Sequence, residues 1–244
     1  MDSPLVPPVS ARSAVLSLLL GAQPPTLNVR EIVGAIGLFG ISESATRVAL
    51  TRMVAGGDLL RHESAYTLSE RLLRRQEQVE PPARRRWSGS WEMAVVTTTG
   101  RAAADRVALR TEMTRHRIAE LREGVWTRPA NLVHHWPDRL REVSTFFEAR
   151  PDGEPAELAA RLWNLDAWAT RGQAYLDALA AVHDEPTRFV TMVAAVHHLQ
   201  TDPLLPTELL PAHWPGERLA TIYADYRAWL AAMREDLRAG GFAR

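Results

Sequence analysis

The stretch FGISESATRVALTRMVAGGDLL (residues 39–60) decides the fold of the amino-terminal part of the chain. Ser42 is of a residue type that caps helices, and a glycine pair of the kind that ends them follows. The stretch therefore predicts one helix between these positions. Apolar residues at helical spacing predict two shorter helices before it, over residues 11–21 and 29–39. Three short helices with a tight turn before the third are typical of a helix-turn-helix.

The third predicted helix has two chemically different sides. With about 100° of rotation per residue, Ala49, Leu50 and Met53 fall together on one side and polar residues fall on the other. We expect the apolar side to pack on the first two helices and the polar side to face the major groove of DNA, where Arg47 can reach guanine. The predicted DNA-contacting residues are Ser42, Ser44, Arg47, Val48, Thr51 and Arg52 on this helix and Arg61 in the segment that follows.

Two short β-type segments follow the third helix. Residues 58–62 and 64–68 are joined around Glu63 and predict an antiparallel hairpin, the wing of a winged helix-turn-helix. Ser69 then caps a further helical segment. We therefore expect a DNA-binding domain over residues 1–80.

The linker EPPARRRWSG separates this domain from a segment of different character. The predicted elements after it are strands over residues 91–98, 124–127 and 143–148, a further candidate strand over 132–134, and a helix over 101–122. The order strand, helix, strand, strand is half of a ferredoxin-like sandwich. The sequence thus predicts a ferredoxin-like middle domain over residues 87–150.

The chain reads as helical from Glu154 onward. The predicted helices cover residues 154–163, 165–183, 185–200 and 215–238, with the proline-rich loop DPLLPTELLPAHWPG between the last two. We expect a helical effector-binding and dimerisation domain over residues 151–244. The predicted fold class is α+β and mainly helical, with a winged helix-turn-helix, a middle α/β domain and a carboxy-terminal helical domain.

Composition narrows the class of protein. The 244 residues carry a formal net charge of zero and include no cysteine, which excludes disulfide frameworks and thiolate zinc sites. All 29 basic residues are arginine, and residues 1–86 hold eleven arginines against eight acids, as suits contact with DNA phosphates. The start, MDSPLVPPVSAR, has no basic region before an apolar stretch, and the longest apolar run near it falls short of the ~20 residues of a membrane span. We expect a cytoplasmic protein without membrane contact.

Motifs that carry catalytic chemistry are few. The strand over residues 91–98 ends without a carboxylate, whereas metal-dependent phosphodiester cleavage needs hard oxygen ligands. The histidine pairs at 134–135 and 197–198 are poor chelates, because neighbouring side chains diverge on helices and on strands. The chain also lacks a P-loop, a G-x-S-x-G elbow and a dinucleotide-binding fingerprint. We expect no enzyme activity, no cofactor and no metal.

Tryptophans are frequent, eight in all, and several lie in or beside the helical segment. They either pack in a core or line a pocket for an aromatic or adenine ring, in which nearby arginines could bind phosphates. The predicted effector-binding residues are Arg161, Trp163, Trp168, Arg171, His198, His213 and Trp214.

These features combine into a family resemblance. The chain resembles the phenylacetate-responsive repressors, the PaaX-like family, in four places. These are residues 39–60, the Tyr-Thr-Leu of the hairpin, the Trp-rich strand and the segment HHLQTDPLLPTELLPAHWPG (residues 197–216). The most specific part is the series Asp-Pro, Leu-Pro, Leu-Leu-Pro and Trp-Pro-Gly in the last segment. The resemblance implies a homodimer that binds palindromic double-stranded operator DNA, represses a catabolic operon and is released by an aryl-acyl-CoA effector such as phenylacetyl-CoA. The alternative is an acyl-CoA-binding protein or enzyme whose winged helix is a docking module.

Overall fold

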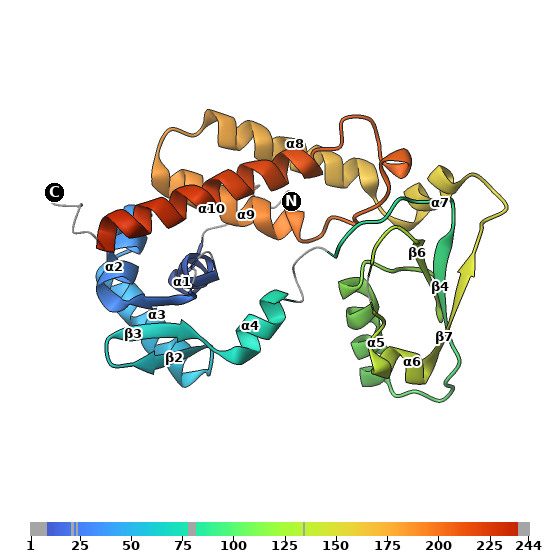
Figure 1. The fold of residues 1–244 in the computed structure, drawn as a ribbon, viewed down its shortest axis with the longest axis horizontal. Helices are drawn as coiled ribbons and strands as arrows, with labels where there is room; N and C mark the ends of the chain where they lie inside the picture. Colours follow the sequence, from blue (N-terminus) through green and yellow to red (C-terminus); the bar gives the residue numbers. More distant parts are fainter. Residues whose placement is uncertain (1–8, 21, 23, 78–81, 134, 239–244) are drawn as a thin grey trace. The chain divides into compact units, whose positions relative to one another are not determined.

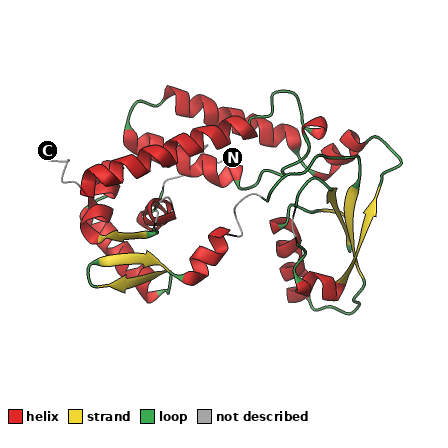
Figure 2. Cartoon of the chain, viewed as in Figure 1, coloured by secondary structure: helices red, strands yellow, loops and turns green. Residues whose placement is uncertain are grey.

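The computed structural model describes residues 9–20, 22, 24–77, 82–133 and 135–238 (Figure 1). The chain is α+β and mainly helical, as the sequence predicts (Figure 2). It forms two compact units, one of residues 1–80, 170–201 and 215–244, the other of residues 81–169 and 202–214. The division into domains over 1–80, 87–150 and 151–244 stays a prediction.

The first unit begins with three helices and a small sheet. The helices are α1 (Ala11–Leu20), α2 (Val29–Leu38) and α3 (Glu43–Ala55), and the strands are β1 (Thr26–Asn28), β2 (Leu59–His62) and β3 (Ala65–Leu68). The sheet is antiparallel in the order β1-β3-β2. The hairpin of β2 and β3 is followed by α4 (Glu70–Glu77). Helices and hairpin thus follow the predicted order, and β1 is a strand that the sequence did not predict.

Local signals explain where α2 and α3 begin. Asn28 accepts hydrogen bonds from the backbone amides of Arg30 and Glu31, and the Glu31 carboxylate accepts one from the Asn28 amide at 2.7 Å. This reciprocal capping satisfies amides that a helix start leaves without partners. Ser42 caps α3 by accepting from the Ala45 amide at 3.3 Å.

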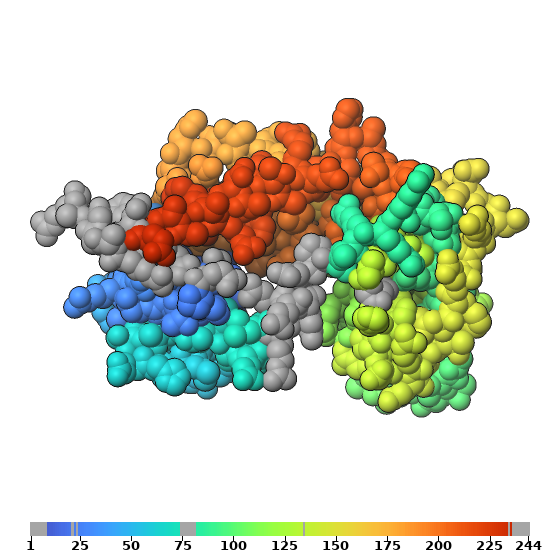
Figure 3. Space-filling model, viewed as in Figure 1, coloured from blue at the N-terminus to red at the C-terminus, as the bar shows by residue number. Residues whose placement is uncertain are grey.

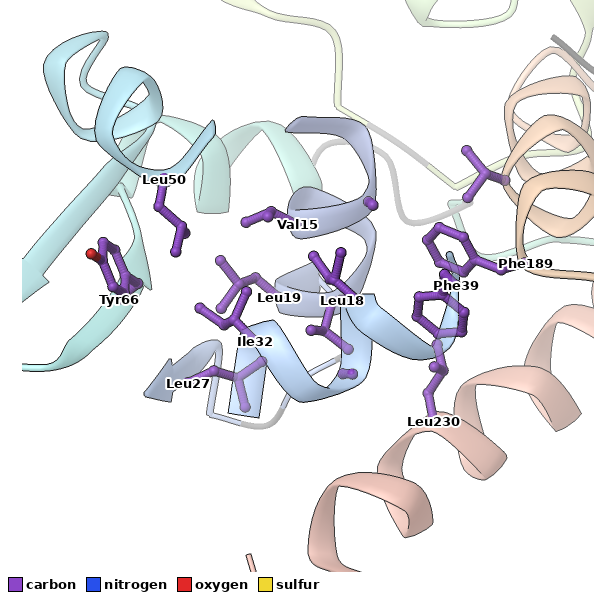
Figure 4. Packing of buried hydrophobic residues seen from close by; sticks show 14 of the residues in the cluster. Val15, Leu18, Leu19, Leu27, Ile32, Phe39, Leu50, Tyr66, Phe189 and Leu230 are labelled. Atoms are coloured by element: carbon purple, nitrogen blue, oxygen red, sulfur yellow. The ribbon is translucent and has the colours of Figure 1, made fainter. Parts of the chain in front are cut away.

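The core of the first unit contains residues from the first three helices and from the last two helices. Helices α9 (Glu185–Leu199) and α10 (Gly216–Arg238) contribute Phe189 and Leu230 to the cluster formed by α1, α2 and α3 (Figure 4). The rings of Phe39 and Phe189 stack with centroids 3.9 Å apart and an interplanar angle of 9°. The amino-terminal helices and the last two helices therefore share one apolar core.

The second unit contains a four-stranded antiparallel sheet. Its elements are β4 (Trp91–Val96), α5 (Ala103–Arg115), β5 (Ala119–Arg122), β6 (Val125–Pro129), α6 (Asp138–Val143) and β7 (Ser144–Ala149). The strand order β5-β6-β4-β7, with a helix after the first and third strands in sequence, is that of a ferredoxin-like sandwich. Helices α5 and α6 cover one face through a cluster that includes Leu109, Met113 and Leu140.

Three details of the second unit differ from the sequence prediction. The helix expected over residues 101–122 ends at Arg115, because Arg117 adopts a left-handed conformation (φ 61°) and β5 follows. Leu132 makes a single β-bridge with Arg84 instead of a strand, and His134 lies outside the described residues. Helix α6 was not predicted.

The predicted carboxy-terminal helices are present with ends shifted by at most two residues. They are α7 (Pro155–Leu162), α8 (Leu165–Ala181), α9 and α10, with a short 3-10 turn (Thr207–Leu209) in the proline-rich segment. Helix α7 and this segment belong to the second unit, where Leu205 and Leu209 pack around Trp91 of β4. The segment is therefore a covering layer of the sheet unit.

Candidate nucleic-acid interface and ligand cavities

Helix α3 has one buried side and one exposed side. The buried residues are Thr46, Ala49, Leu50 and Met53, which include all three that the sequence placed on the apolar side. Every residue predicted to contact DNA has an exposed side chain; these are Ser42, Ser44, Arg47, Val48, Thr51, Arg52 and Arg61. The exposed side of α3 thus presents the predicted residues together.

Arg47 lies in the middle of this exposed side. Its guanidinium contacts the Glu43 carboxylate, one turn earlier, at 2.7 Å, and the two side chains are 56% and 59% exposed. An ion pair this exposed contributes little to stability, so a stronger acceptor can replace Glu43. Thr51 donates its hydroxyl to the Arg47 carbonyl at 3.0 Å, which leaves oxygen lone pairs free to accept.

The hairpin supplies a second basic group. Arg61 donates from Nε to the carbonyl of Glu63 at 2.9 Å, and its guanidinium lies 5.9 Å from the ring centroid of Tyr66. Glu63 itself takes a left-handed conformation (φ 54°), which closes the tight turn between β2 and β3. The hairpin lies open on the surface of the first unit in the view of Figure 3, coloured cyan to turquoise.

A buried carboxylate fixes α3 and the hairpin to their neighbours. Asp58, between α3 and β2, accepts from Arg12 of α1 at 2.8 Å and from Arg71 of α4 at 2.6 Å. Charge-assisted hydrogen bonds of this kind are stronger than neutral ones and have defined directions. The junction between α3 and the hairpin is therefore held from both sides.

In physical terms this arrangement suits duplex DNA. A helix with a polar exposed side fits the major groove, where an arginine fork can bond to guanine O6 and N7. Hydroxyl groups and a flanking arginine suit the phosphates on either side of the groove.

The predicted effector residues are divided between the two units. Arg161 and Trp163 line a cavity of about 520 Å³ in the second unit, together with Asp166 and Glu208. Arg171 and His198 belong to the first unit, where the His198 ring lies 5.5 Å from that of Tyr175.

Trp168, His213 and Trp214 lie in the second unit, where two of them pack against each other. The rings of Trp168 and Trp214 stack at 4.3 Å with an angle of 10°. Trp214 Nε1 donates to the buried carboxylate of Asp202 at 3.2 Å, and the Leu204 amide donates to the same carboxylate at 2.7 Å. Burial raises the pKa of Asp202, and these hydrogen bonds oppose the rise. The two tryptophans thus hold the proline-rich segment in place.

A buried arginine completes this attachment. Arg128 of β6 donates to the carbonyls of His116 and Pro129 at 3.0 and 3.1 Å and to Asn131 Oδ1 at 3.0 Å. Asn131 in turn donates to the Leu204 carbonyl at 2.9 Å. Burial lowers the pKa of Arg128 to about 10, which still leaves it charged at neutral pH.

A second charged cluster lies on α5. The buried Glu112 carboxylate accepts from Arg139 and contacts Arg115 at 2.9 Å and His116 at 3.4 Å. Burial alone raises the pKa of Glu112, but the Arg139 hydrogen bond and the neighbouring positive charges outweigh burial and hold the pKa below its usual value.

A larger cavity was missed by sequence reasoning. It has a volume of about 760 Å³ and lies in the second unit between α5 and the β5–β6 hairpin. Its lining includes Arg101, Arg106, Arg110 and Arg122. The sequence shows several arginines over residues 101–122, which could have indicated this cavity. Because one continuous helix was predicted there, the sequence prediction did not place β5 beside α5.

Neither a metal site nor a membrane-spanning helix is found in the described part of the chain. No cluster of three or more histidine, aspartate or glutamate side chains there could hold a metal ion. Within the same residues, no helix combines the length and the apolar character needed to cross a membrane.

Comparison with known proteins gives matches along most of the chain. Family models match as PaaX-like protein over residues 10–72, as PaaX protein central Cas2-like domain over 84–158, and as PaaX-like protein C-terminal domain over 163–237. The solved structure of the uncharacterized protein Rv0674 from Mycobacterium tuberculosis is similar, with a TM-score of 0.80 and 46% sequence identity over 93% of this chain and 98% of that chain. No curated protein matches.

Proposed function

The chain belongs to the PaaX-like family, whose members are transcriptional regulators, and from that premise we propose that it is a sequence-specific DNA-binding repressor of a catabolic operon. The observation that carries the proposal is the exposed side of α3, where Arg47 lies between hydroxyl residues and is held only by an exposed ion pair. In this proposal residues 1–80 form a winged helix-turn-helix.

Each part of the exposed surface has its own role in this proposal. Arg47 reads guanine in the major groove, while Ser42, Ser44 and Thr51 contact phosphates or thymine methyl groups. Arg52 and Arg61 bind the backbone on either side. Val48, which is half-exposed on the same side of α3, contacts apolar base edges.

The proposed repressor acts as a homodimer on a palindromic operator. Helix-turn-helix dimers present two recognition helices to half-sites about one helical turn apart, or a multiple of it. A single α3 offers contacts to only a few base pairs, so two copies are needed for useful specificity.

An aryl-acyl-CoA effector, of which phenylacetyl-CoA is the first candidate, is proposed to release the repressor from DNA. Such control requires the thioester to bind the free form more tightly than the DNA-bound form.

The test is fluorescence anisotropy of the purified protein on a labelled fragment of its own upstream region, at physiological salt, with and without phenylacetyl-CoA. We expect binding tighter than to a shuffled fragment, and release by the thioester. Equal binding to both fragments would refute the regulator, and turnover of an acyl-CoA would favour the enzyme alternative. Specific binding unaffected by the thioester would refute only the effector.

A further inference from the structure

The larger cavity of the second unit has the size of a small-molecule site. Its volume of about 760 Å³ falls within the range of roughly 300–1,000 Å³ that ligand pockets occupy. Residues from α5, from the end of β4 and from the β5–β6 hairpin line it. Its walls therefore come from three parts of one compact unit.

The charge of this cavity is positive. Four arginines stand against two glutamates, Glu120 and Glu123, in its lining. Arg110 is paired with Glu120 at 2.6 Å, and Arg106 gives one N–H to the Arg101 carbonyl at 2.9 Å. A guanidinium has five N–H donors, so Arg106 keeps most of its donors for a ligand. Positive charge and spare donors suit phosphate groups.

The cavity also has an apolar wall. Val107 of α5 is 65% exposed beside it, and the buried Trp126 of β6 forms part of its lining with the Arg110 guanidinium 5.7 Å from the ring centroid. A ligand made only of phosphate would leave this wall in contact with water. A ligand with both phosphates and a flat or apolar part would cover it.

The smaller cavity has the opposite charge. Arg161 is its single arginine, and Asp166 and Glu208 share its lining. A polyanion brought there would meet more negative than positive side chains, and its binding would be correspondingly weaker. Charge therefore separates the two candidate cavities for a phosphorylated ligand.

We propose that the arginine-lined cavity between α5 and the β5–β6 hairpin binds the phosphorylated nucleotide portion of a small-molecule ligand. Arg106 and Arg122 contact the phosphates, and Val107 and Trp126 lie against the apolar part. The ligand class rests on the proposed function, because a CoA thioester carries such a nucleotide portion. The concave shape and apolar wall favour a small molecule over a DNA backbone.

The test is isothermal titration calorimetry of the full-length protein with coenzyme A and with adenosine 3′,5′-bisphosphate. We expect both probes to bind, and the double variant Arg106→Ala/Arg122→Ala to lose about tenfold or more in affinity, because two charge-assisted contacts are removed. The matched control is Arg86→Ala, an exposed arginine outside both cavities, which should bind both probes as the wild type does. Arg161→Ala tests the rival site, because the sequence predicts Arg161 to bind the effector, and it too should keep wild-type affinity. Both arginines of the double variant are exposed, so its melting temperature should stay close to that of the wild type.

A second variant tests the apolar wall without touching an arginine. Val107→Thr keeps the size of the side chain and the charge of the cavity but makes the wall more polar, and it should weaken the binding of both nucleotide probes while leaving that of inorganic pyrophosphate unchanged. Loss of affinity in Arg161→Ala with full affinity in the double variant would overturn the proposal. The proposal would also be overturned if the wild-type protein bound inorganic pyrophosphate as tightly as it binds the nucleotide probes. It would be overturned as well if neither nucleotide probe bound.

The outcome can be separated from that of the proposed function. Nucleotide binding is measured without DNA, so it can succeed even if the upstream fragment is not bound. A double variant that keeps nucleotide affinity but loses DNA affinity would assign these arginines to DNA and overturn the proposal.

Discussion

Replacing Phe39 or Phe189 by alanine should strongly lower the stability of the protein. The reason is that α9 and α10 share one apolar core with α1, α2 and α3, so these helices should unfold together. The two rings stack at 3.9 Å and are 4% and 1% exposed, although 150 residues separate them in sequence. Removal of a buried phenylalanine side chain costs about 3–5 kcal/mol. A natural domain has only about 5–15 kcal/mol of stability, so either variant should be strongly destabilised.

The double variant measures the contact itself. A stacked aromatic pair contributes about 0.5–1.5 kcal/mol beyond its buried area, so the loss in the double variant should fall short of the sum of the single losses by that amount. The assay is urea denaturation followed by circular dichroism. Phe147→Ala is the control, because this ring is 51% exposed and its loss should change stability by about 0.5 kcal/mol or less. The shared core would be refuted if the stability loss of the double variant equalled the sum of the two single losses within about 0.3 kcal/mol. An unchanged urea midpoint for Phe189→Ala would refute it as well.

Three further predictions concern the α3 surface and the second unit. Arg47→Ala should cost about 1–3 kcal/mol of operator binding and relax the preference for one base, measured by competition with single-base operator variants; equal weakening on every sequence would make Arg47 a phosphate contact. Glu112→Gln should destabilise the protein at neutral pH, because the lowered pKa of Glu112 gives stability that is present above about pH 4.5 and lost as pH falls through the folded-state value. The difference in urea midpoint from wild type should shrink in acid, and a constant difference would contradict the assignment. Asn131→Ala removes the acceptor of Arg128 Nη2 and the donor to the Leu204 carbonyl, and it should cost about 1–3 kcal/mol for each of these two groups in urea unfolding, whereas an unchanged midpoint would show that water replaces the amide.

Elements with local signals were predictable from the sequence. Helix α3 has a serine cap and a glycine end, and the predicted helix over residues 185–200 corresponds to α9, where Asp184 caps the start by accepting from the Thr187 amide. Strand β1 was missed because its three residues become a strand only by pairing with β3, as in Thr26 opposite Thr67. Such pairing is a property of the folded chain and leaves no local pattern.

The end of α5 shows a second limit of sequence reasoning. Neither glycine nor proline marks it, and the chain turns through Arg117, a residue type that rarely takes a left-handed conformation. The helical pattern therefore ran on into β5, and the cavity lined by Arg106 and Arg122 was overlooked. The exposed side of α3, by contrast, follows from helical periodicity alone.

Two tryptophans of the carboxy-terminal part, Trp168 of α8 and Trp214 of the proline-rich segment, show a third limit. Aromatic residues pack in cores and line pockets alike, and composition does not distinguish the two. In the structure Trp168 and Trp214 stack on each other, and the Asp202 carboxylate accepts from the Trp214 ring. Only the three-dimensional contacts show which partners these rings have.

Methylation protection of guanine N7 in the chain's own upstream fragment tests most directly whether α3 reads DNA, because N7 lies in the major groove. We predict protected guanines in two half-sites about one helical turn, or a multiple of it, apart. The protection should be lost in Arg47→Ala, whereas Arg52→Ala should keep it at saturating protein. Binding of the fragment without protection of any guanine N7, or protection unchanged in Arg47→Ala, would contradict it.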